Sequence, residues 1–284
     1  MDRRQFPALG CGIGLRRQHY EALLATHPAI DWLEIISENF MVPGGRPLAV
    51  LESVRTCYPI VCHGVSLSIG SSDPLDQAYL KQLKDLARRF HPAWISDHLC
   101  WTGAGGHNLH DLLPLPYHGQ VVAHVARRVR EVQDILQQPI ALENISSYLS
   151  WRSSELEEWD FVRAVAEEAD CAILLDINNI YVNAFNHGFD PHRYIDAIPA
   201  ERVIQYHLAG HSNFGSYLLD SHDQPICATV WELYDYAVAR LGPLPTLIEW
   251  DDKLPTLEEL IRVANHARSR QSSPFAELAT IQAR

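Results

Sequence analysis

The segment Val203–His222, with the sequence VIQYHLAGHSNFGSYLLDSH, carries three side chains of types that commonly bind metals. His207 lies near the end of a short apolar run that is typical of a β-strand, and Asp220 and His222 lie in the polar stretch after Gly210. Side chains two residues apart on an extended backbone point to the same side, so Asp220 and His222 can share a target. A lone histidine at a strand end is more often packed or solvated than a ligand, so the other strands decide its role.

Five further apolar runs also stop at a histidine or a carboxylate, which makes a series of candidate metal ligands. A single such residue is explained equally well by a solvated loop or a helix cap, and this holds for Glu143 and Asp176 in particular. A whole series is harder to explain in that way, because a charge at the end of a buried strand is costly unless it is paired or metal-bound. The candidate ligands are His63, His98, Glu143, Asp176, His207, Asp220, His222 and Glu249.

The composition of this ligand set bears on the metal. Four imidazoles and four carboxylates exceed what one six-coordinate ion can use, and carboxylates bridge, so the sequence predicts two or three neighbouring ions. Mixed nitrogen and oxygen ligands without cysteine favour iron or manganese, with zinc as a further option.

Other polar residues stand beside the expected ligands or follow another strand. They could orient ligands or hold substrate backbone, although loop, turn and capping roles explain them equally well. These residues are Asp97, Asn144, Asn178, Asn179, Glu38 and Asn39. His187 is a weaker candidate, since a loop histidine beside a glycine is usually only exposed. His107, His110 and His211 are expected in loops, the first two in the glycine-rich segment WTGAGGHNLHD.

Eight apolar runs alternate with helix-length amphipathic segments, and this alternation predicts parallel βαβ units with right-handed crossovers. At this length we expect them to close into one (β/α)8 barrel of the TIM type, with the candidate ligands at the carboxyl ends of its strands. The expected strands are Leu9–Ile13, Trp32–Ile36, Pro59–His63, Ala93–His98, Ile140–Glu143, Ala172–Asp176, Val203–His207 and Thr246–Glu249. A doubly wound sheet is the rival, but the glycines of Gly10–Gly14 have the wrong spacing for a GxGxxG loop.

Helix starts are expected at four capping signals. Asp73 and Asp190 each precede a proline, and Ser154 and Thr256 each begin a capping-box pattern. The other expected helices are Arg16–Thr26, Pro47–Thr56, Tyr117–Gln137 and Ile226–Leu241. Residues 1–269 are expected to form the barrel, and residues 270–284 a flexible C-terminal tail.

The composition narrows the possible partners of the chain. It has 284 residues, 47% of them hydrophobic, and a formal net charge of −12, which argues against binding to duplex nucleic acid. No apolar run approaches the length of a membrane span, and the N-terminus lacks the apolar core of a signal peptide. The six cysteines show no CxxC pair and no disulfide-like framework, which favours reduced thiols in a cytoplasmic protein.

Together these stretches resemble one known family, the multinuclear non-heme iron-dependent oxidative enzymes. This family includes the methanobactin-biosynthesis oxygenase and enzymes that modify cysteine in ribosomally made precursor peptides. The resemblance extends over roughly residues 8 to 268. It rests on WLEIISENF, CHGVSLSIG, WISDHLCW, LLPLPY, ALENISSY, LLDINNIYVNAFNHG, QYHLAGH, DSH and IEWD.

The resemblance implies a TIM-type barrel that holds two or three mixed-valent irons and uses O2 to oxidise a peptide side chain, typically cysteine. It implies one iron at His63, His98 and Glu143. Glu143 would bridge to a second iron held by Asp176, His207 and Glu249, and Asp220 with His222 would serve a further one. It also implies a companion protein that presents the precursor peptide.

Two alternatives remain at this stage. A metal-dependent barrel of the sugar isomerase or epimerase type, or of the apurinic endonuclease type, also sets histidines and carboxylates at strand ends. The net charge of −12 argues against the endonuclease, which needs a basic groove. A non-catalytic protein that binds metal or peptide is the second alternative. The sequence does not name the peptide, the product, the companion protein or the oligomeric state.

Overall fold

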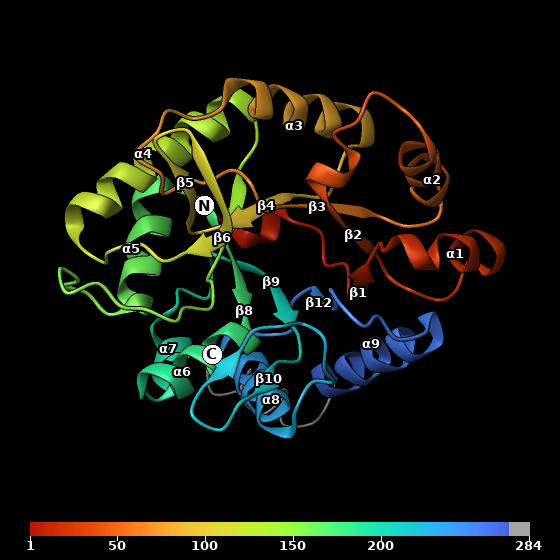
Figure 1. The fold of residues 1–284 in the computed structure, drawn as a ribbon. Coiled ribbons are helices and arrows are strands. Elements are labelled where there is room, and N and C mark those ends of the chain that lie inside the picture. Colours follow the sequence, from red (N-terminus) through yellow and green to blue (C-terminus); the bar gives the residue numbers. More distant parts are fainter. Residues whose placement is uncertain (273–284) are drawn as a thin grey trace.

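Eight parallel strands close into a barrel in the spatial order β1-β12-β9-β8-β7-β4-β3-β2 (Figure 1). The structure is a computed structural model and describes residues 1–272. Every barrel strand overlaps one of the expected apolar runs, so the predicted (β/α)8 barrel of the TIM type is confirmed. The barrel strands are β1 (Cys11–Gly14), β2 (Leu33–Ile36), β3 (Ile60–Gly64), β4 (Ile95–His98), β7 (Ile140–Glu143), β8 (Ala172–Asp176), β9 (Val203–Leu208) and β12 (Thr246–Ile248).

The helices form a ring around this barrel (Figure 1). Helix α6 follows β8 directly and was missed in the sequence, because its asparagine-rich start was taken for a loop. The α-helices of the described residues are α1 (Tyr20–Thr26), α2 (Arg46–Val54), α3 (Gln77–Phe90), α4 (Gly119–Leu136), α5 (Glu158–Ala169), α6 (Ile177–His187), α7 (Pro191–Ala197), α8 (Ala228–Leu241) and α9 (Leu257–Gln271). A short 3-10 helix, η3 (Ser37–Phe40), follows β2.

Two of the four expected helix starts are wrong. The N-cap of α3 is Asp76, which accepts hydrogen bonds from the backbone N–H groups of Ala78 and Tyr79. Asp73 instead accepts from the N–H groups of Gly105 and Gly106, at 2.9 Å each. The second error concerns α5, which begins at Glu158 rather than near residue 155.

The other two starts are confirmed. Asp190 caps α7, with Pro191 in its first turn, and Thr256 caps α9 by accepting from the N–H of Glu259. Helix α9 runs to Gln271, so the first two residues of the expected tail are helical; residues 273–284 of that tail lie outside the described residues. No helix among residues 1–272 is long and apolar enough to cross a membrane.

Two small hairpins, absent from the sequence-based prediction, lie outside the barrel sheet. The glycine-rich segment expected to be a loop forms β5 (Trp101–Ala104) and β6 (His107–Leu113), and a second hairpin joins β10 (Ser212–Asn213) to β11 (Leu218–Leu219). The turn of the first hairpin is Gly105-Gly106, with φ of +61° and +77°, a backbone conformation that glycine adopts without strain.

An apolar cluster fills the lower part of the barrel interior, beneath the strand ends. Gly12 is required here, because a Cβ at this position would lie 2.5 Å from the Trp32 ring. The cluster consists of Trp32, Val61, Trp94, Ala141, Ala172, Leu174, Ile204 and Leu247. It is a dry floor beneath the carboxyl ends of the strands.

Candidate metal centre

Strand alternation places the expected ligands directly above this floor. Side chains two residues apart on a strand face the same side. Val61 of β3 lies in the apolar floor, and His63 follows two residues later; Leu174 and Asp176 of β8 repeat this pattern. The ligands at the strand ends therefore face the barrel interior, whereas Asp220 and His222 lie in the loop after β11. Most of the strand-end ligands are almost completely buried: His63 is 1% exposed, and Asp176 and His207 are 0% exposed.

Three groups of side chains offer ligand atoms that lie within 4.8 Å of one another. Glu143 belongs to the first two groups, and Glu249 to the last two. The groups are His63, His98 and Glu143; then Glu143, Asp176, His207 and Glu249; then His222, Glu249 and Asp251. Because carboxylates can bridge metal ions, groups that share carboxylates are compatible with more than one bound ion.

In the first group, two imidazoles converge on one carboxylate. The Nε2 atoms of His63 and His98 lie 3.2 Å and 3.4 Å from Glu143 Oε2. The Nδ1 atom of His63 is 2.8 Å from the Ser96 hydroxyl, and that of His98 is 3.0 Å from the Gly64 carbonyl. The carbonyl can only accept, so His98 Nδ1 carries its proton, and Nε2 is left with a lone pair toward Glu143.

The second group lies deepest. His207 Nδ1 is 3.1 Å from Glu143 Oε1 and 3.0 Å from Glu249 Oε2. Asp176 does two things at once: its Oδ1 caps α6 by accepting from the N–H of Asn179 at 2.7 Å, while its Oδ2 has no hydrogen-bond partner. The capping role considered for Asp176 is therefore real, and it leaves one oxygen free to bind metal.

The third group lies nearest the mouth and adds Asp251, which was not among the candidates predicted from the sequence. His222 Nδ1 lies 2.9 Å from Asp251 Oδ2 and 3.6 Å from Glu249 Oε2. Asp220 is next to this group, with Oδ1 2.6 Å from His222 Nε2. The amide of Asn178 donates to the same Asp220 oxygen at 2.7 Å and holds it in place.

Unpaired buried polar atoms gather at this place. Among the described residues, eleven buried side-chain nitrogen and oxygen atoms have no hydrogen-bond partner, although such atoms are normally satisfied. Six of them belong to expected ligands: His63 Nε2, Glu143 Oε2, Asp176 Oδ2, His207 Nδ1, His222 Nε2 and Glu249 Oε2. His222 Nε2 is close to Asp220, but without hydrogen-bond geometry. Lone pairs that converge in a buried space fit bound cations.

The electrostatics agree with this fit. Burial raises the pKa of Glu143, but the imidazoles around it, His207 foremost, outweigh burial and bring the pKa to about 2. Burial, reinforced by the charge of Glu143, raises the pKa of Asp176 well above its usual value. Burial lowers the pKa of His207, yet the carboxylates around it raise the pKa well above the usual value. The cluster holds more negative charge than its imidazoles neutralise, and metal cations would supply the balance.

The expected supporting residues have distinct places. Asn144 exchanges two hydrogen bonds with the backbone of Asp176: its amide donates to the Asp176 carbonyl at 3.0 Å and accepts from the Asp176 N–H at 2.9 Å. The amide of Asn179 donates to the Asn144 carbonyl at 3.0 Å. These contacts fix the backbone of Asp176 at the end of β8. The contact of Asn178 fixes the side chain of Asp220 in the loop before His222.

Asp97 and Glu38 lie behind the first group. Asp97 accepts from the N–H of His98 at 2.7 Å, and burial, with the charge of Glu38, raises its pKa to about 7. Glu38 accepts from the N–H of Val65 at 2.9 Å and from the Tyr79 hydroxyl at 2.8 Å. These carboxylates order the chain around β3 and β4.

Two predicted residues lie away from the ligands, and one residue near them was not predicted. Asn39 is exposed on η3. His187, at the end of α6, contacts the hydroxyl and carbonyl of Ser147 at 2.9 Å each and lines a separate pocket. Glu34 was missed because it lies within β2 rather than at a strand end; it is 4% exposed and lies 3.2 Å from His207 Nε2. Alternate residues of β2 face the barrel interior, and this alternation is the sequence signal that would have identified Glu34.

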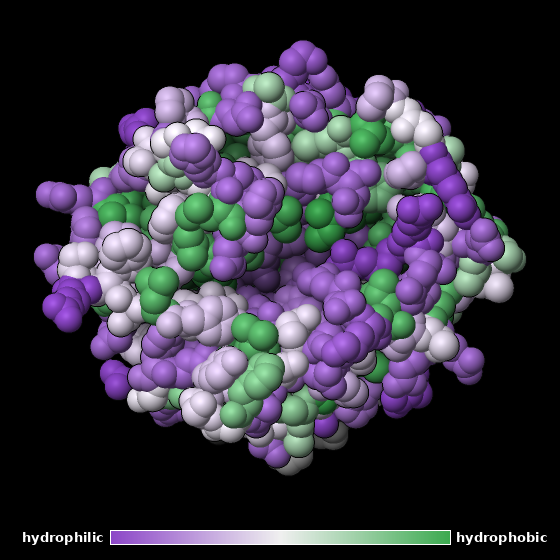
Figure 2. All heavy atoms as spheres, in the orientation of Figure 1, coloured by the Kyte–Doolittle hydropathy of each residue, from purple (hydrophilic) through white to green (hydrophobic). Residues whose placement is uncertain are grey.

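Six of the eight expected ligands line a pocket of about 210 Å³ at the barrel mouth, with Ile36, Val65, Leu112 and Ile145 as apolar walls; Asp176 and His207 are not part of its lining. Figure 2 shows the face around it: hydrophilic residues line a central hollow, and hydrophobic residues gather on parts of its rim.

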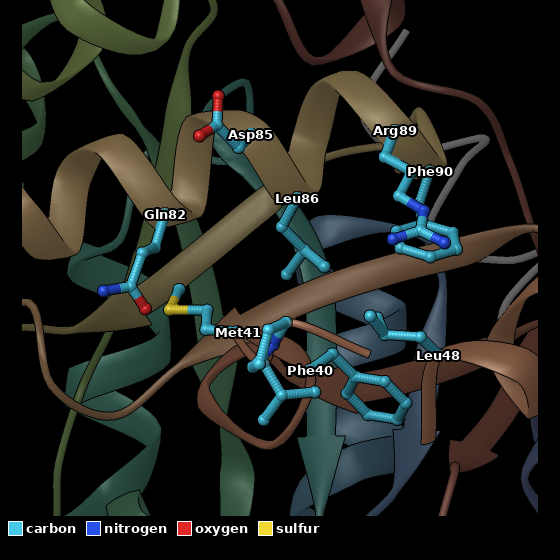
Figure 3. Close-up of a pocket in the computed structure, with 10 residues that line it drawn as sticks. Phe40, Met41, Leu48, Gln82, Asp85, Leu86, Arg89 and Phe90 are labelled. Carbon is cyan, nitrogen blue, oxygen red and sulfur yellow. The ribbon is translucent and has the colours of Figure 1, made fainter. Parts of the chain in front are cut away.

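A larger pocket of about 390 Å³ lies away from the ligands, between η3, α2 and α3 (Figure 3). Leu86 points into it from α3, toward Met41 and Phe40. Its polar side chains are Gln82, Asp85 and Arg89. Asp85 pairs with Lys81, and Arg89 pairs with Glu52, so both charges already have partners. The pocket is therefore a groove between helices.

Comparison with known proteins finds relatives that match almost the whole chain. The family model described as "RiPP precursor modification enzyme MbnB/TglH/ChrH" matches residues 10–272. A UPF0276 protein of Anaeromyxobacter sp. (strain Fw109-5) is 55% identical over 270 residues, which is 95% of each chain. A UPF0276 protein of Caulobacter vibrioides (strain NA1000 / CB15N) is 49% identical, over 93% of this chain and 95% of the relative.

Solved structures at low identity share the fold. An L-ribulose 3-epimerase aligns with a TM-score of 0.60 at 15% identity, over 98% of this chain and 97% of that one. Endonuclease IV of Thermus thermophilus aligns with a TM-score of 0.60 at 16% identity, over 93% of this chain and 99% of that one. At such identities the likeness concerns the barrel alone.

Proposed function

We propose, since the chain belongs to the family of RiPP precursor modification enzymes described as MbnB/TglH/ChrH, that it is an O2-dependent multinuclear non-heme iron enzyme. Its substrate would be a ribosomally made precursor peptide, and the modified side chain would be a cysteine of that peptide. The observation that carries the proposal is the convergence of six unpaired buried ligand atoms on three groups that share Glu143 and Glu249.

The donor set indicates how the metal would be held. His63 and His98 would bind through Nε2, with Glu143 bridging to the deeper group, and Glu249 would bridge from there to the outer group. Two or three ions fit this sequence of shared carboxylates, and nitrogen and oxygen donors without thiolate suit iron. Asp220 and Asp251 flank His222 and would complete the outermost position.

Bound iron would supply a Lewis acid for a substrate thiolate and a redox couple for O2. The contribution of the protein is to position and shield this chemistry. The apolar floor beneath the ligands and the apolar walls of the pocket keep water away from the buried donors. The rigid strand ends would hold the substrate carbon close to the reacting centre, which favours attack at that carbon.

The thiol in this scheme comes from the peptide. None of the residues that line the mouth pocket, all of them within the described chain, is a cysteine. Cys62 directly precedes His63 on β3 and therefore points to the opposite side of the strand. Burial raises the pKa of its thiol to about 12, so it stays protonated and does not compete for metal. A pocket of about 210 Å³ admits one side chain of an extended peptide rather than a folded domain.

The rim of the mouth offers a surface for the rest of the peptide and for a companion protein that presents it. Tyr148 and Leu149, from the loop after β7, are 50% and 45% exposed, and Phe214 and Tyr217, between β10 and β11, are 56% and 43% exposed. The N–H of Asp220 donates to the Tyr148 hydroxyl at 2.9 Å, which connects this apolar rim to the outer ligand group.

Co-expression tests the proposal. Short Cys-bearing peptides from the reading frames next to the gene are each produced with the protein and with the products of the other adjacent frames, and the peptide mass is measured in air and without O2. We expect an O2-dependent mass change that disappears when the cysteine is replaced by serine and when Glu143→Gln is introduced. Turnover of a sugar without O2, or an unchanged peptide with fully iron-loaded protein, would contradict it.

A further inference from the structure

A chain of four buried side chains crosses the barrel interior and ends at a candidate ligand. The indole N–H of Trp94 donates to Gln205 Oε1 at 2.6 Å, and the amide of Gln205 donates to Glu34 Oε2 at 2.7 Å. Glu34 in turn faces His207 Nε2, at 3.2 Å from Oε1 and 3.3 Å from Oε2. None of the four is more than 4% exposed, so water does not compete for these contacts.

Trp94 sets the donor-to-acceptor direction of these hydrogen bonds. An indole nitrogen only donates, so the atom of Gln205 that faces Trp94 has to be the amide oxygen. The amide NH2 of Gln205 then has to face Glu34. The orientation of an amide is normally a matter of assignment, but here the donor-only partner leaves one choice.

This direction determines the protonation of His207. The Glu34 carboxylate already accepts from Gln205, and as an acceptor it requires a donor at His207 Nε2. Because Glu34 keeps the proton on Nε2, the proton that a metal ion displaces is the one on Nδ1, and the lone pair for the metal is on that atom. That atom points at Glu143 and Glu249 and is one of the unpaired buried atoms.

The neighbouring histidines have the opposite arrangement. His63 and His98 contact Ser96 and Gly64 through Nδ1, and both turn Nε2 toward Glu143. Because Nδ1 is closer to the main chain than Nε2, binding through Nδ1 keeps an ion close to β9. His207 is therefore built to serve the deep group, where Asp176 also points.

We propose that Glu34, oriented by Gln205 and Trp94, is a positioning residue that makes His207 a metal ligand through Nδ1. This inference rests on the proposed metal centre and assigns a role to three residues outside it. Such hydrogen-bond partners of ligating histidines typically change metal affinity by about 10–100-fold when they are removed.

The test uses Zn²⁺, which is diamagnetic, as the probe. Protein labelled with ¹⁵N-histidine is loaded with Zn²⁺, and the ring nitrogens of His207 are assigned by their loss in His207→Gln. We expect a proton on Nε2 and metal on Nδ1 for His207, and the reverse for His63 and His98. In Glu34→Gln we expect loss of the Nε2–H signal and Zn²⁺ affinity about 10–100-fold weaker. The new amide oxygen accepts from Gln205, so its NH2 group faces His207 Nε2, which then cannot carry a proton. The matched control is Glu21→Gln on exposed α1.

A double variant separates positioning from direct ligation. In Glu34→Gln combined with Gln205→Glu, the carboxylate at position 205 accepts from Trp94 and from the new amide, whose oxygen accepts from His207 Nε2–H. We expect this swap to restore the His207 signal and most of the Zn²⁺ affinity. Trp94→Phe, which removes the indole N–H and keeps an aromatic ring, should weaken Zn²⁺ affinity less than Glu34→Gln.

Three outcomes would overturn the assignment: His207 bound to Zn²⁺ through Nε2, unchanged His207 signals and affinity in Glu34→Gln, or a swap that rescues neither. If Zn²⁺ left the His207 signals of the unaltered protein unchanged, the proposed metal centre itself would fail. Binding through Nε2 would refute the positioning role alone.

Discussion

Glu143→Gln is the substitution that separates a shared carboxylate from a single ligand. Glu143 lies between two candidate groups, with Oε2 3.2 Å from His63 Nε2 and Oε1 3.1 Å from His207 Nδ1. The amide keeps the shape but removes the charge and one acceptor oxygen. We therefore expect loss of metal from both groups, whereas Asp220→Asn, at the outermost position, should cost at most one ion per chain.

Bound Fe(II) stabilises the folded state, and this stabilisation, measured without O2, gives the size of the effect. At free metal a hundred times Kd, binding at one site stabilises the folded state by about 2.7 kcal/mol. A hundredfold weaker site retains about 0.4 kcal/mol under the same conditions. For a chain of this size, the metal-induced rise in Tm should fall from roughly 5–10 °C to about 1 °C.

The assay compares Tm with Fe(II) and with chelator, together with metal content per chain. Glu167→Gln, on the exposed side of α5, is the matched control and should behave as the unaltered protein does. Circular dichroism of the metal-free variant verifies that the barrel is folded. Unchanged metal content and an unchanged Tm rise in Glu143→Gln would refute the bridging role.

Three further predictions concern stability. Burial raises the pKa of Glu158 from 4.5 to about 7, so the folded state binds this proton more tightly than the unfolded state does. The contribution of Glu158 to the free energy of unfolding should therefore fall by up to roughly 3 kcal/mol as the pH rises from 4.5 to 7. Urea unfolding of Glu158→Gln should lack this decline, and an equal slope in both proteins would contradict it. Asp76→Ala should cost about 1 kcal/mol of the free energy of unfolding by uncapping α3. The Asp73 carboxylate bonds to the β5–β6 turn, so Asp73→Ala should leave α3 unaffected in amide hydrogen exchange. Gly64→Ala should cost about 1–3 kcal/mol in thermal unfolding, since its Cβ would lie 2.2 Å from Asp97 Oδ2; an unchanged Tm would show that this contact relaxes freely.

The ligands at strand ends could be found in the sequence because strand alternation and apolar runs are local signals. His63, Asp176 and Glu249 each end such a run, and the fold brings all three into the predicted ring. Their assignment as metal ligands stays a prediction. Glu34 was not visible in the same way, because its role depends on Gln205 and His207 of a strand far along the chain.

The helix starts show the same limit. Asp73 and Asp76 are both plausible N-caps from local sequence, and Asp73-Pro74 fits the usual pattern better. The long-range contact between Asp73 and the turn at Gly105 decides against it, since this contact occupies both Asp73 oxygens together with Gly106. Helix α6 was missed because Asn178 and Asn179 favour loops, whereas here their side chains bond to Asp220 and to the Asn144 carbonyl.

The central claim is tested most directly by the metal content of the protein purified in parallel with and without air. Elemental analysis should find at least two irons per chain, reduced to no more than one in Glu143→Gln, because the outer group does not contain Glu143. Protein that contained only zinc, or no more than one metal per chain at full occupancy, would contradict a multinuclear iron centre at this barrel mouth.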